Sequence, residues 1–234
     1  MKIFKTYFIV LLFAISAACG SNDENKSVSE IAQTSESNSP NFKRYNIEKG
    51  IVEYEISGSR TGKEILYFDN WGMREANYIT AETSIGGFSI KENKITILDG
   101  EWTYNIDLDK KTGSKIKTPL LEELIEAAGD KDLGELGEEM LIRMGGKKIG
   151  KDELLGKTCD IWELQSLNTR SWVWNWITLK TEAKLMGISV VKTATKIDAN
   201  ASIPDEKFNI PAGIVITEGV DPGSILNKLK GNKK

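Results

Sequence analysis

Residues 94–108, KITILDGEWTYNIDL, carry the clearest structural signal in the chain. Alternating apolar residues run into Asp99-Gly100, a dipeptide that favours a two-residue turn between antiparallel strands. The second strand then alternates again, so that its large apolar side chains share one side. These side chains are Trp102, Tyr104 and Ile106. The stretch therefore predicts a β-hairpin with one apolar and one polar face.

The same alternation extends toward the N-terminus of this hairpin. Residues 51–56, IVEYEI, place Val52, Tyr54 and Ile56 on one face and glutamates on the other, which is typical of a half-buried strand. Shorter strand candidates follow at residues 64–68, 76–79 and 88–90. The first half of the chain therefore predicts an antiparallel meander.

Residues 118–144 interrupt the strands with apolar residues at helical spacing. Pro119 lies in the first turn, where proline is tolerated, and Gly129 breaks the spacing midway. We therefore expect two helices joined near Gly129-Asp130, ending before Gly145-Gly146. Strands are predicted to return at residues 157–164, 171–179, 188–197 and 203–210.

The predicted strand SWVWNWITL, at residues 171–179, places Trp172, Trp174 and Trp176 on one face, because side chains alternate along a strand. Trp102 and Trp162 could join them across the sheet. Three interpretations remain open for so many indoles: a filled core, the lining of a cavity for an apolar ligand, or an exposed platform that stacks sugar rings.

Composition excludes several classes of function. The chain has 234 residues, of which 40% are hydrophobic and 28% are charged, as in ordinary globular proteins. A pI near 5.4 argues against a nucleic-acid partner, which requires a basic surface. The chain has no histidine, so the commonest general base and metal ligand is missing. We expect no cofactor, no metal site and no catalytic residues, although an enzyme using carboxylates such as Asp69 or Glu101 is the minority alternative.

The N-terminus predicts export. A basic start is followed by about a dozen apolar residues ending in Ser16-Ala17-Ala18-Cys19, which is typical of a secretory signal peptide. Cysteine after two alanines resembles a lipobox, although Ser16 replaces the usual leucine. Lipidation of Cys19 would anchor the chain to a membrane, and would leave Cys159 without a partner, as a small buried hydrophobic residue.

The expected organisation has four parts. Residues 1–18 are a signal peptide, and residues 19–41 are a lipidated flexible tether rich in serine, asparagine and glutamate. Residues 42–225 form a single domain, and residues 226–234 form a basic tail. The expected location is the cell envelope of a Gram-negative bacterium, on the outer membrane, facing either the periplasm or the cell surface.

Four short motifs in this order resemble the outer-membrane lipoprotein carrier and receptor superfamily (LolA/LolB-like), and its uncharacterised lipoprotein relatives most of all. The motifs are Tyr67-Phe68-Asp69 followed by Met73-Arg74, LGKTCDIW at residues 155–162, Trp174-Asn175-Trp176-Ile177, and PDEKFNIPAG at residues 204–213. The resemblance covers roughly residues 42–213. It implies a mainly β (α+β) fold: an incomplete antiparallel β-barrel or curved sheet, with the central helical insert as its plug or lid.

The leading hypothesis is a membrane-anchored, non-enzymatic protein that binds an apolar ligand, such as a lipid or acyl chain, in the concave face. The expected ligand-binding residues are Trp102, Trp162, Trp172, Trp174, Trp176, Leu121, Leu124 and Met140. The alternative is a surface-exposed module that binds a glycan or an envelope protein partner through exposed tryptophans.

Overall fold

The computed structural model describes residues 43–100, 102–117, 129–185 and 187–219. These residues form one sheet of 12 strands in the order β12-β6-β5-β4-β3-β2-β1-β11-β10-β9-β8-β7. Neighbouring strands are antiparallel except β12, which runs parallel to β6. The strands are β1 (Gly50–Gly58), β2 (Arg60–Asp69), β3 (Arg74–Ile85), β4 (Phe88–Asp99), β5 (Trp102–Asp107), β6 (Thr112–Lys117), β7 (Lys147–Leu154), β8 (Lys157–Leu164), β9 (Thr169–Trp174), β10 (Ile177–Leu185), β11 (Ile188–Ala199) and β12 (Val215–Glu218).

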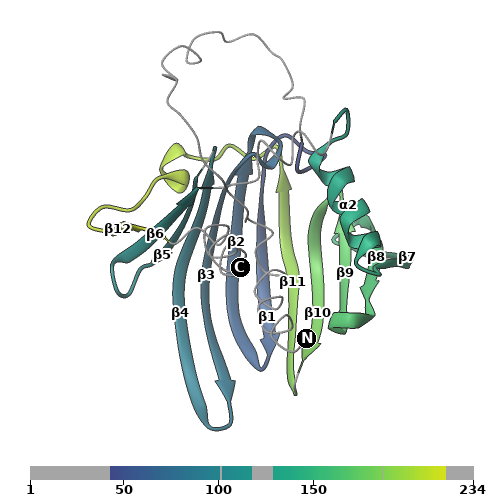
Figure 1. The fold of residues 1–234 in the computed structure, drawn as a ribbon, viewed down its shortest axis with the longest axis horizontal. Coiled ribbons are helices and arrows are strands. Elements are labelled where there is room, and N and C mark those ends of the chain that lie inside the picture. The colour runs from purple at the N-terminus through teal and green to yellow at the C-terminus, as the bar shows by residue number, and fades with distance from the viewer. Residues whose placement is uncertain (1–42, 101, 118–128, 186, 220–234) are drawn as a thin grey trace, which may run out of the picture.

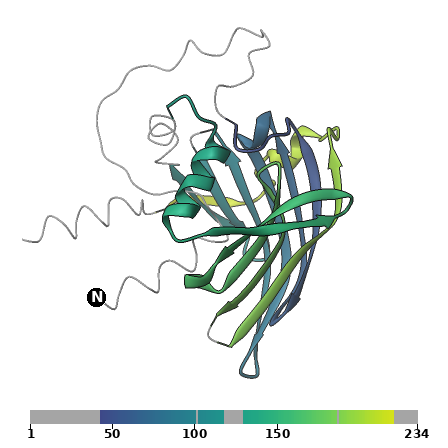
Figure 2. The ribbon, with the colours of Figure 1, turned by 90° about the vertical axis from the view of Figure 1, so that its right-hand side faces the viewer.

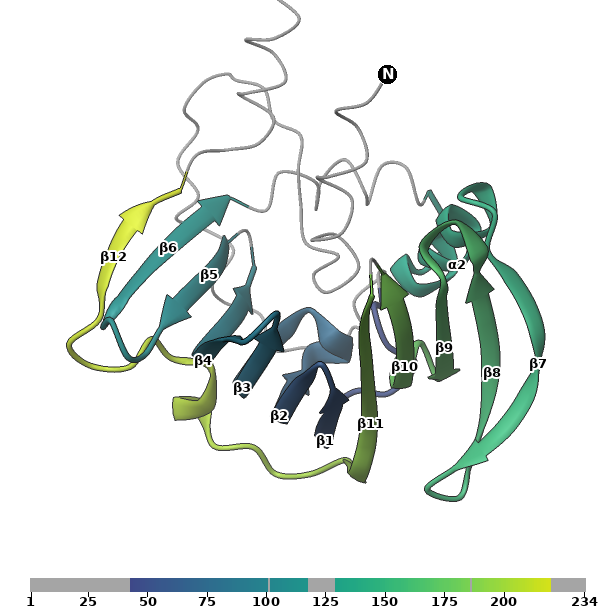
Figure 3. The ribbon, with the colours of Figure 1, turned by 90° about the horizontal axis from the view of Figure 1, so that it is seen from below.

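The sheet is open and strongly curved (Figure 3), with β12 and β7 as its two edges. Helix α2 (Leu133–Arg143) lies on the concave side, which we call the inner face. The chain between β11 and β12 runs along the convex side, the outer face, and includes the short helix η3 (Asp205–Phe208). The predicted fold, a mainly β curved sheet that does not close into a barrel, is confirmed.

The predicted meander is confirmed in the first half of the chain, where β1 to β6 follow one another across the sheet (Figure 1). Asp99 is the last residue of β4 and pairs with Trp102, so the predicted hairpin is confirmed, with its connection beginning at Gly100 rather than at Asp99. Strands β1 to β4 are longer than predicted, and the separate candidates at residues 88–90 and 94–98 are parts of the single strand β4.

The second half differs from the prediction in two places. Residues 171–179 are not one strand, because Asn175 and Trp176 have φ values of 48° and 63° and form the turn between β9 and β10. Two positive φ values are the requirement of the favoured hairpin turn, and asparagine adopts them readily. Residues 203–210 are not a strand either, since they contain η3, which packs on the outer face.

The predicted helical region is confirmed in its second part. Helix α2 begins after Asp132, whose backbone N–H donates to the Glu135 side chain at 3.2 Å, and it ends at Arg143. The first expected helix, including Leu121 and Leu124, falls on residues 118–128, outside the described residues. Among the described residues, no helix is long and apolar enough to cross a membrane.

Two hydrophobic cores lie on opposite faces of the sheet. The inner core contains Val52, Tyr54, Leu66, Phe68, Cys159, Trp172, Ile177, Leu179 and Ala194. The outer core contains Ala76, Ile95, Ile97, Ile106 and Phe208. Phe208 of η3 covers the outer core, so the sheet is stabilised by burial of apolar surface on both faces. Cys159 is fully buried, as predicted.

Residues 43–48 form a strap across one end of the sheet. The N–H groups of Arg44 and Tyr45 both donate to the carbonyl of Trp71 at 3.0 Å, and the N–H of Asn46 donates to the carbonyl of Asn175 at 3.1 Å. The N–H of Lys43 donates to Asp132 at the start of α2, also at 3.1 Å. The strap therefore ties the β2–β3 turn, the β9–β10 turn and α2 together.

Candidate ligand-binding face

The inner face of β1 and β2 is an apolar strip. Antiparallel register places Val52 beside Leu66, and Gly50 beside Phe68, with no irregularity between these two strands. Val52 and Phe68 have no exposed surface, and Tyr54, Ile56 and Leu66 are buried. Each such side chain contributes about 1.5–3 kcal/mol when removed from water. The strip has the chemistry that an alkyl chain requires.

A row of polar side chains crosses the inner face of the next four strands, which also carries Ile79, Leu98 and Ile116. Register from β2 to β6 aligns Leu66 with one row of neutral hydrogen-bonding side chains, one from each strand. This polar row consists of Asn77, Thr96, Asn105 and Ser114. Thr96 and Asn105 are hydrogen-bonded at 3.4 Å. The apolar strip of β1 and β2 therefore borders a polar row that begins at Asn77 of β3.

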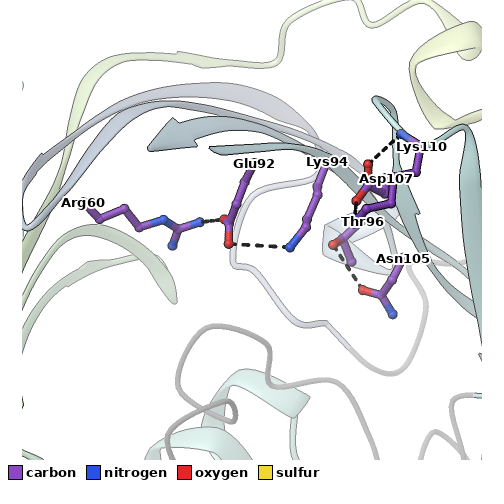
Figure 4. A network of polar contacts seen from close by, with 7 residues as sticks. All are labelled: Arg60, Glu92, Lys94, Thr96, Asn105, Asp107 and Lys110. Atoms are coloured by element: carbon purple, nitrogen blue, oxygen red, sulfur yellow. Dashed lines mark hydrogen bonds and ion pairs between the residues drawn. The ribbon is translucent and has the colours of Figure 1, made fainter. Parts of the chain in front are cut away.

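Charged side chains beside the polar row are paired with one another (Figure 4). Glu92 contacts Arg60 at 2.5 Å and Lys94 at 3.5 Å, and Asp107 accepts a hydrogen bond from the Lys110 ammonium at 2.8 Å. The hydrogen bonds from Lys110 hold the pKa of Asp107 below its ordinary value. The surface beside the polar row therefore carries charges of both signs, and favours neither an anionic nor a cationic ligand.

A buried polar cluster lies where the apolar strip meets the polar row. Glu64 is only 4% exposed, and its Oε1 accepts hydrogen bonds from Lys192 at 2.7 Å and from Asn77 at 3.1 Å. The Lys192 ammonium also lies 4.6 Å from the centre of the Tyr54 ring. Burial, reinforced by the Glu64 carboxylate, raises the pKa of Tyr54 well above 10. The Tyr54 hydroxyl donates to the carbonyl of Thr178.

Tyr45 and Arg44 from the strap border the apolar strip at one end. The Tyr45 ring packs edge-on against Phe68, with the ring centres 5.0 Å apart. Its hydroxyl donates to Glu75, which also pairs with Arg44 at 3.0 Å. Burial raises the pKa of Tyr45 well above 10, and the Glu75 carboxylate adds to this shift. The strap thus places two polar side chains at the rim of the inner face.

The structure brings only some of the predicted tryptophans together. Trp172 is 7% exposed and belongs to the inner core, and Trp174 packs against the same core. Trp176 lies in the β9–β10 turn, where it contacts Gly134 of α2. The sequence pattern could not reveal this turn, because a three-fold tryptophan alternation is equally compatible with an uninterrupted strand.

The other two predicted tryptophans lie elsewhere. Trp102 is separated from the inner core by the sheet, because it shares a face of β5 with Tyr104 and Ile106, which belong to or pack against the outer core. Trp162 is 4% exposed and pairs with Ser171, on the side of β8 opposite Ile161 and Trp172. Alternation along each strand, read with the register, therefore divides the five indoles into separate groups.

A lysine ammonium lies over the ring of each of four of these tryptophans. Lys180 lies 4.3 Å from the ring centre of Trp172, and the other pairs are Lys115 with Trp102 at 4.5 Å, Lys157 with Trp174 at 4.8 Å and Lys148 with Trp162 at 5.1 Å. Cation–π attraction stabilises such pairs by about 0.5–1 kcal/mol at exposed sites. The lysines occupy ring faces that a stacking sugar would need.

The remaining predicted site residues lie away from these contacts or outside the described part of the chain. Met140 is 44% exposed near the end of α2. Leu121, Leu124 and the lipidation residue Cys19 lie outside the described residues. Asp69, one of the two carboxylates considered for catalysis, pairs with Arg74 at 3.1 Å, and burial raises its pKa despite that cation. The other, Glu101, lies outside the described residues. The described residues contain no cluster of three or more potential metal ligands.

A shallow groove of about 540 Å³ lies over the ends of β8 to β11, away from the apolar strip. Its lining is mostly polar and includes Glu163, Arg170, Glu182 and Lys184. Arg170 donates to Glu163 at 2.8 Å, which lowers the pKa of that carboxyl group. No predicted ligand-binding residue lines this groove, so we do not assign the ligand to it.

No protein-family model matches the chain, and no curated protein sequence matches it. Solved structures similar to this one include an uncharacterised conserved protein from Thermus thermophilus, with a TM-score of 0.49, 6% identity, and coverage of 74% of this chain and 91% of that one. LprF from Mycobacterium bovis has a TM-score of 0.32 at 9% identity, covering 68% and 89%. A putative outer membrane lipoprotein-sorting protein domain from Vibrio parahaemolyticus has a TM-score of 0.28 at 10% identity, covering 69% and 89%.

The likeness is one of fold, and the similar structures include a lipoprotein-sorting domain.

Sequence reasoning missed Glu64, Asn77 and Lys192. A signal for Glu64 was present, because in EILYF it alternates with Leu66 and Phe68, which places a carboxylate on the apolar side of the strand. Lys192 gave no comparable signal, since its strand carries polar residues on both sides.

Proposed function

We propose that this chain is an envelope lipoprotein, anchored through lipid on Cys19, that binds one ligand with an alkyl chain on its inner face and catalyses no reaction. The main support for this proposal is the apolar strip of β1 and β2, which lies beside Trp172 and Trp174 on the concave side of an open sheet. A ligand could enter the concave side of an open sheet from its edge, and its alkyl chain would take the place of contacts that now bury Val52 and Phe68.

The tryptophan contacts favour this proposal over the glycan-binding alternative. Trp172 and Trp162 are 7% and 4% exposed, and both indoles lie beside a lysine ammonium. A sugar-stacking platform requires ring faces open to water. The carboxylates also favour binding over catalysis. Glu64, Glu75 and Glu92 are each held in an ion pair, which engages the carboxylate that a general base would need free.

The two faces of the sheet supply a direct test. Ile79 lies on the inner face, in register with Glu64, and Ile65 lies on the outer face, in register with Tyr78. Both side chains are half-buried. The photoreactive residue p-benzoylphenylalanine would be placed at Ile79 or at Ile65 in the full chain, kept soluble in amphipol. Each protein would then be irradiated with an alkyne-labelled 14-carbon fatty acid.

We expect crosslinking from position 79 and none above background from position 65. The matched position controls for lipid adsorbed on the outside of the protein. Equal labelling from both positions, or labelling from position 65 alone, would contradict binding on the inner face.

Exposed apolar residues at the β3–β4 hairpin favour a second candidate function, docking to an envelope partner. Ile85, Phe88 and Ile90 are 46%, 79% and 61% exposed at the tip of two long strands. In the envelope, Phe88→Ser should abolish any crosslink from a photoreactive residue at Ser89 to a partner protein. The same crosslink retained in Phe88→Ser would argue against an apolar contact.

A further inference from the structure

The polar cluster on the inner face points to the chemistry of the ligand, if the proposed function holds. Glu64 and Lys192 form an ion pair with side chains 4% and 16% exposed, beside Tyr54 and Ile56 of the apolar strip. Desolvation of two such charges commonly offsets their attraction, so a buried pair adds little to folding stability. Its position on the candidate binding face suggests a role in recognition.

One hydrogen-bond acceptor in this cluster has no partner among the described residues. Asn77 donates through Nδ2 to Glu64, which fixes the orientation of the amide and leaves Oδ1 as its acceptor. Asn77 Oδ1 is buried and receives no hydrogen bond. Buried acceptors are nearly always satisfied, so this atom calls for an O–H or N–H donor that the described residues do not supply, and a bound ligand could supply it.

The surroundings of Asn77 determine which donor fits. The two groups next to a ligand atom at this point, the Glu64 carboxylate and Asn77 Oδ1, are both acceptors. The Glu64 charge is already paired with Lys192, and an anionic head has no donor to offer Asn77 Oδ1. Thr96, Asn105 and Ser114 continue the polar row from Asn77 toward the sheet edge with neutral hydroxyl and amide groups.

We propose that Asn77 is a ligand-binding residue, and that the ligand is a neutral amphipath whose alkyl chain lies on β1 and β2 and whose hydroxyl or amide N–H donates to Asn77 Oδ1. Monoacylglycerols and lipids with amide-linked chains have this chemistry. Fatty-acid anions, and esters without a donor, do not.

Three ligands with the same 14-carbon chain test this inference on the full chain in amphipol at pH 8. They are monomyristoylglycerol, which has hydroxyl donors, methyl myristate, which has none, and ionised myristate. Each would displace the fluorescent probe N-phenyl-1-naphthylamine. We expect monomyristoylglycerol to bind about fivefold to tenfold more tightly than either of the others, which is the effect of one buried hydrogen bond.

Asn77→Leu should remove this preference by weakening monomyristoylglycerol binding about fivefold to tenfold while leaving methyl myristate binding nearly unchanged. The matched control is Asn93→Leu, which changes an asparagine in β4 whose side chain contacts Asp109. Equal affinity for all three ligands, or a preference that persists in Asn77→Leu, would overturn the inference while leaving the proposed function intact. Binding of none of them would overturn both. If Asn77→Leu does not fold, the comparison of ligands on the unaltered chain decides alone.

Discussion

Trp172 on β9 donates its indole N–H to the carboxylate of Asp152 on β7, 3.0 Å away across the intervening strand β8. The hydrogen bond links the edge strand to the inner core, because Trp172 is 7% exposed whereas Asp152 lies at the protein surface. It satisfies the only polar atom of a large buried ring.

Removal of that acceptor should loosen the edge of the sheet. Asp152→Ala leaves the indole N–H without its partner, and we expect the free energy of unfolding to fall by about 1 kcal/mol. Lys151→Ala, the adjacent exposed position, should change it by less than about 0.5 kcal/mol. Urea unfolding followed by tryptophan emission measures both, and equal effects would show that the hydrogen bond adds no stability.

The buried ion pair predicts a non-additive pair of substitutions. Lys192→Met leaves the Glu64 charge buried without its cation, and we expect a loss of about 3 kcal/mol in unfolding free energy. Glu64→Leu combined with Lys192→Met should be within about 1 kcal/mol of the unaltered chain, because neither charge then needs burial. Chemical denaturation of the single and double variants gives the unfolding free energies to be compared. A double variant less stable than Lys192→Met would show that the ion pair contributes to folding stability, and would contradict this prediction.

Two glycines of α2 should respond in opposite directions to alanine. A Cβ at Gly134 would clash with the Trp176 ring, whereas a Cβ at Gly137 has no atom within 4 Å. We expect Gly134→Ala to lower the unfolding free energy by about 1–3 kcal/mol. Gly137→Ala should raise it by about 0.5–1 kcal/mol through its better helix propensity. Thermal unfolding compares them, and equal midpoints would place α2 away from the β9–β10 turn.

The count of reactive thiols tests both cysteines. Burial raises the pKa of the Cys159 thiol, with Asp152 and Asp160 adding to the shift, so little nucleophilic thiolate forms near neutral pH. Because its folded-state pKa is raised, reaction should become faster as the pH increases, and much faster on unfolding. A thiol reagent applied to the mature chain should detect no rapidly reacting group when folded. In denaturant it should detect one if Cys19 carries lipid, and a count of two would contradict lipidation.

Local sequence patterns were sufficient where one strand face is apolar. β1, β8 and β11 were predicted nearly to their ends, because alternation and turn residues agree there. β6 and β7 were missed, since TGSKIK and KKIGKDEL have few apolar residues and are held by pairing with a neighbour.

The candidate site was less accessible from sequence than the fold. Tryptophans dominated the prediction because of their size, but which of them share a core depends on a turn at Asn175 and on the register of β8 and β9. The Glu64 cluster joins residues from β2, β3 and β11, and one of its contacts spans 128 positions in sequence. Neither spacing nor composition encodes a contact of that kind.

The strap also determines at which end of the sheet an N-terminal anchor would be attached. Residues 43–48 enter at the end of the sheet where the β2–β3 and β9–β10 turns lie, while the β3–β4 hairpin projects from the opposite end (Figures 1 and 2). A lipid on Cys19 would attach the domain through the first of these ends, and the hairpin bearing Phe88 would lie at the end farther from the point of attachment. The attachment point and the exposed apolar hairpin would then lie at opposite ends of the sheet, so the hairpin could contact a partner while the lipid stays in the membrane.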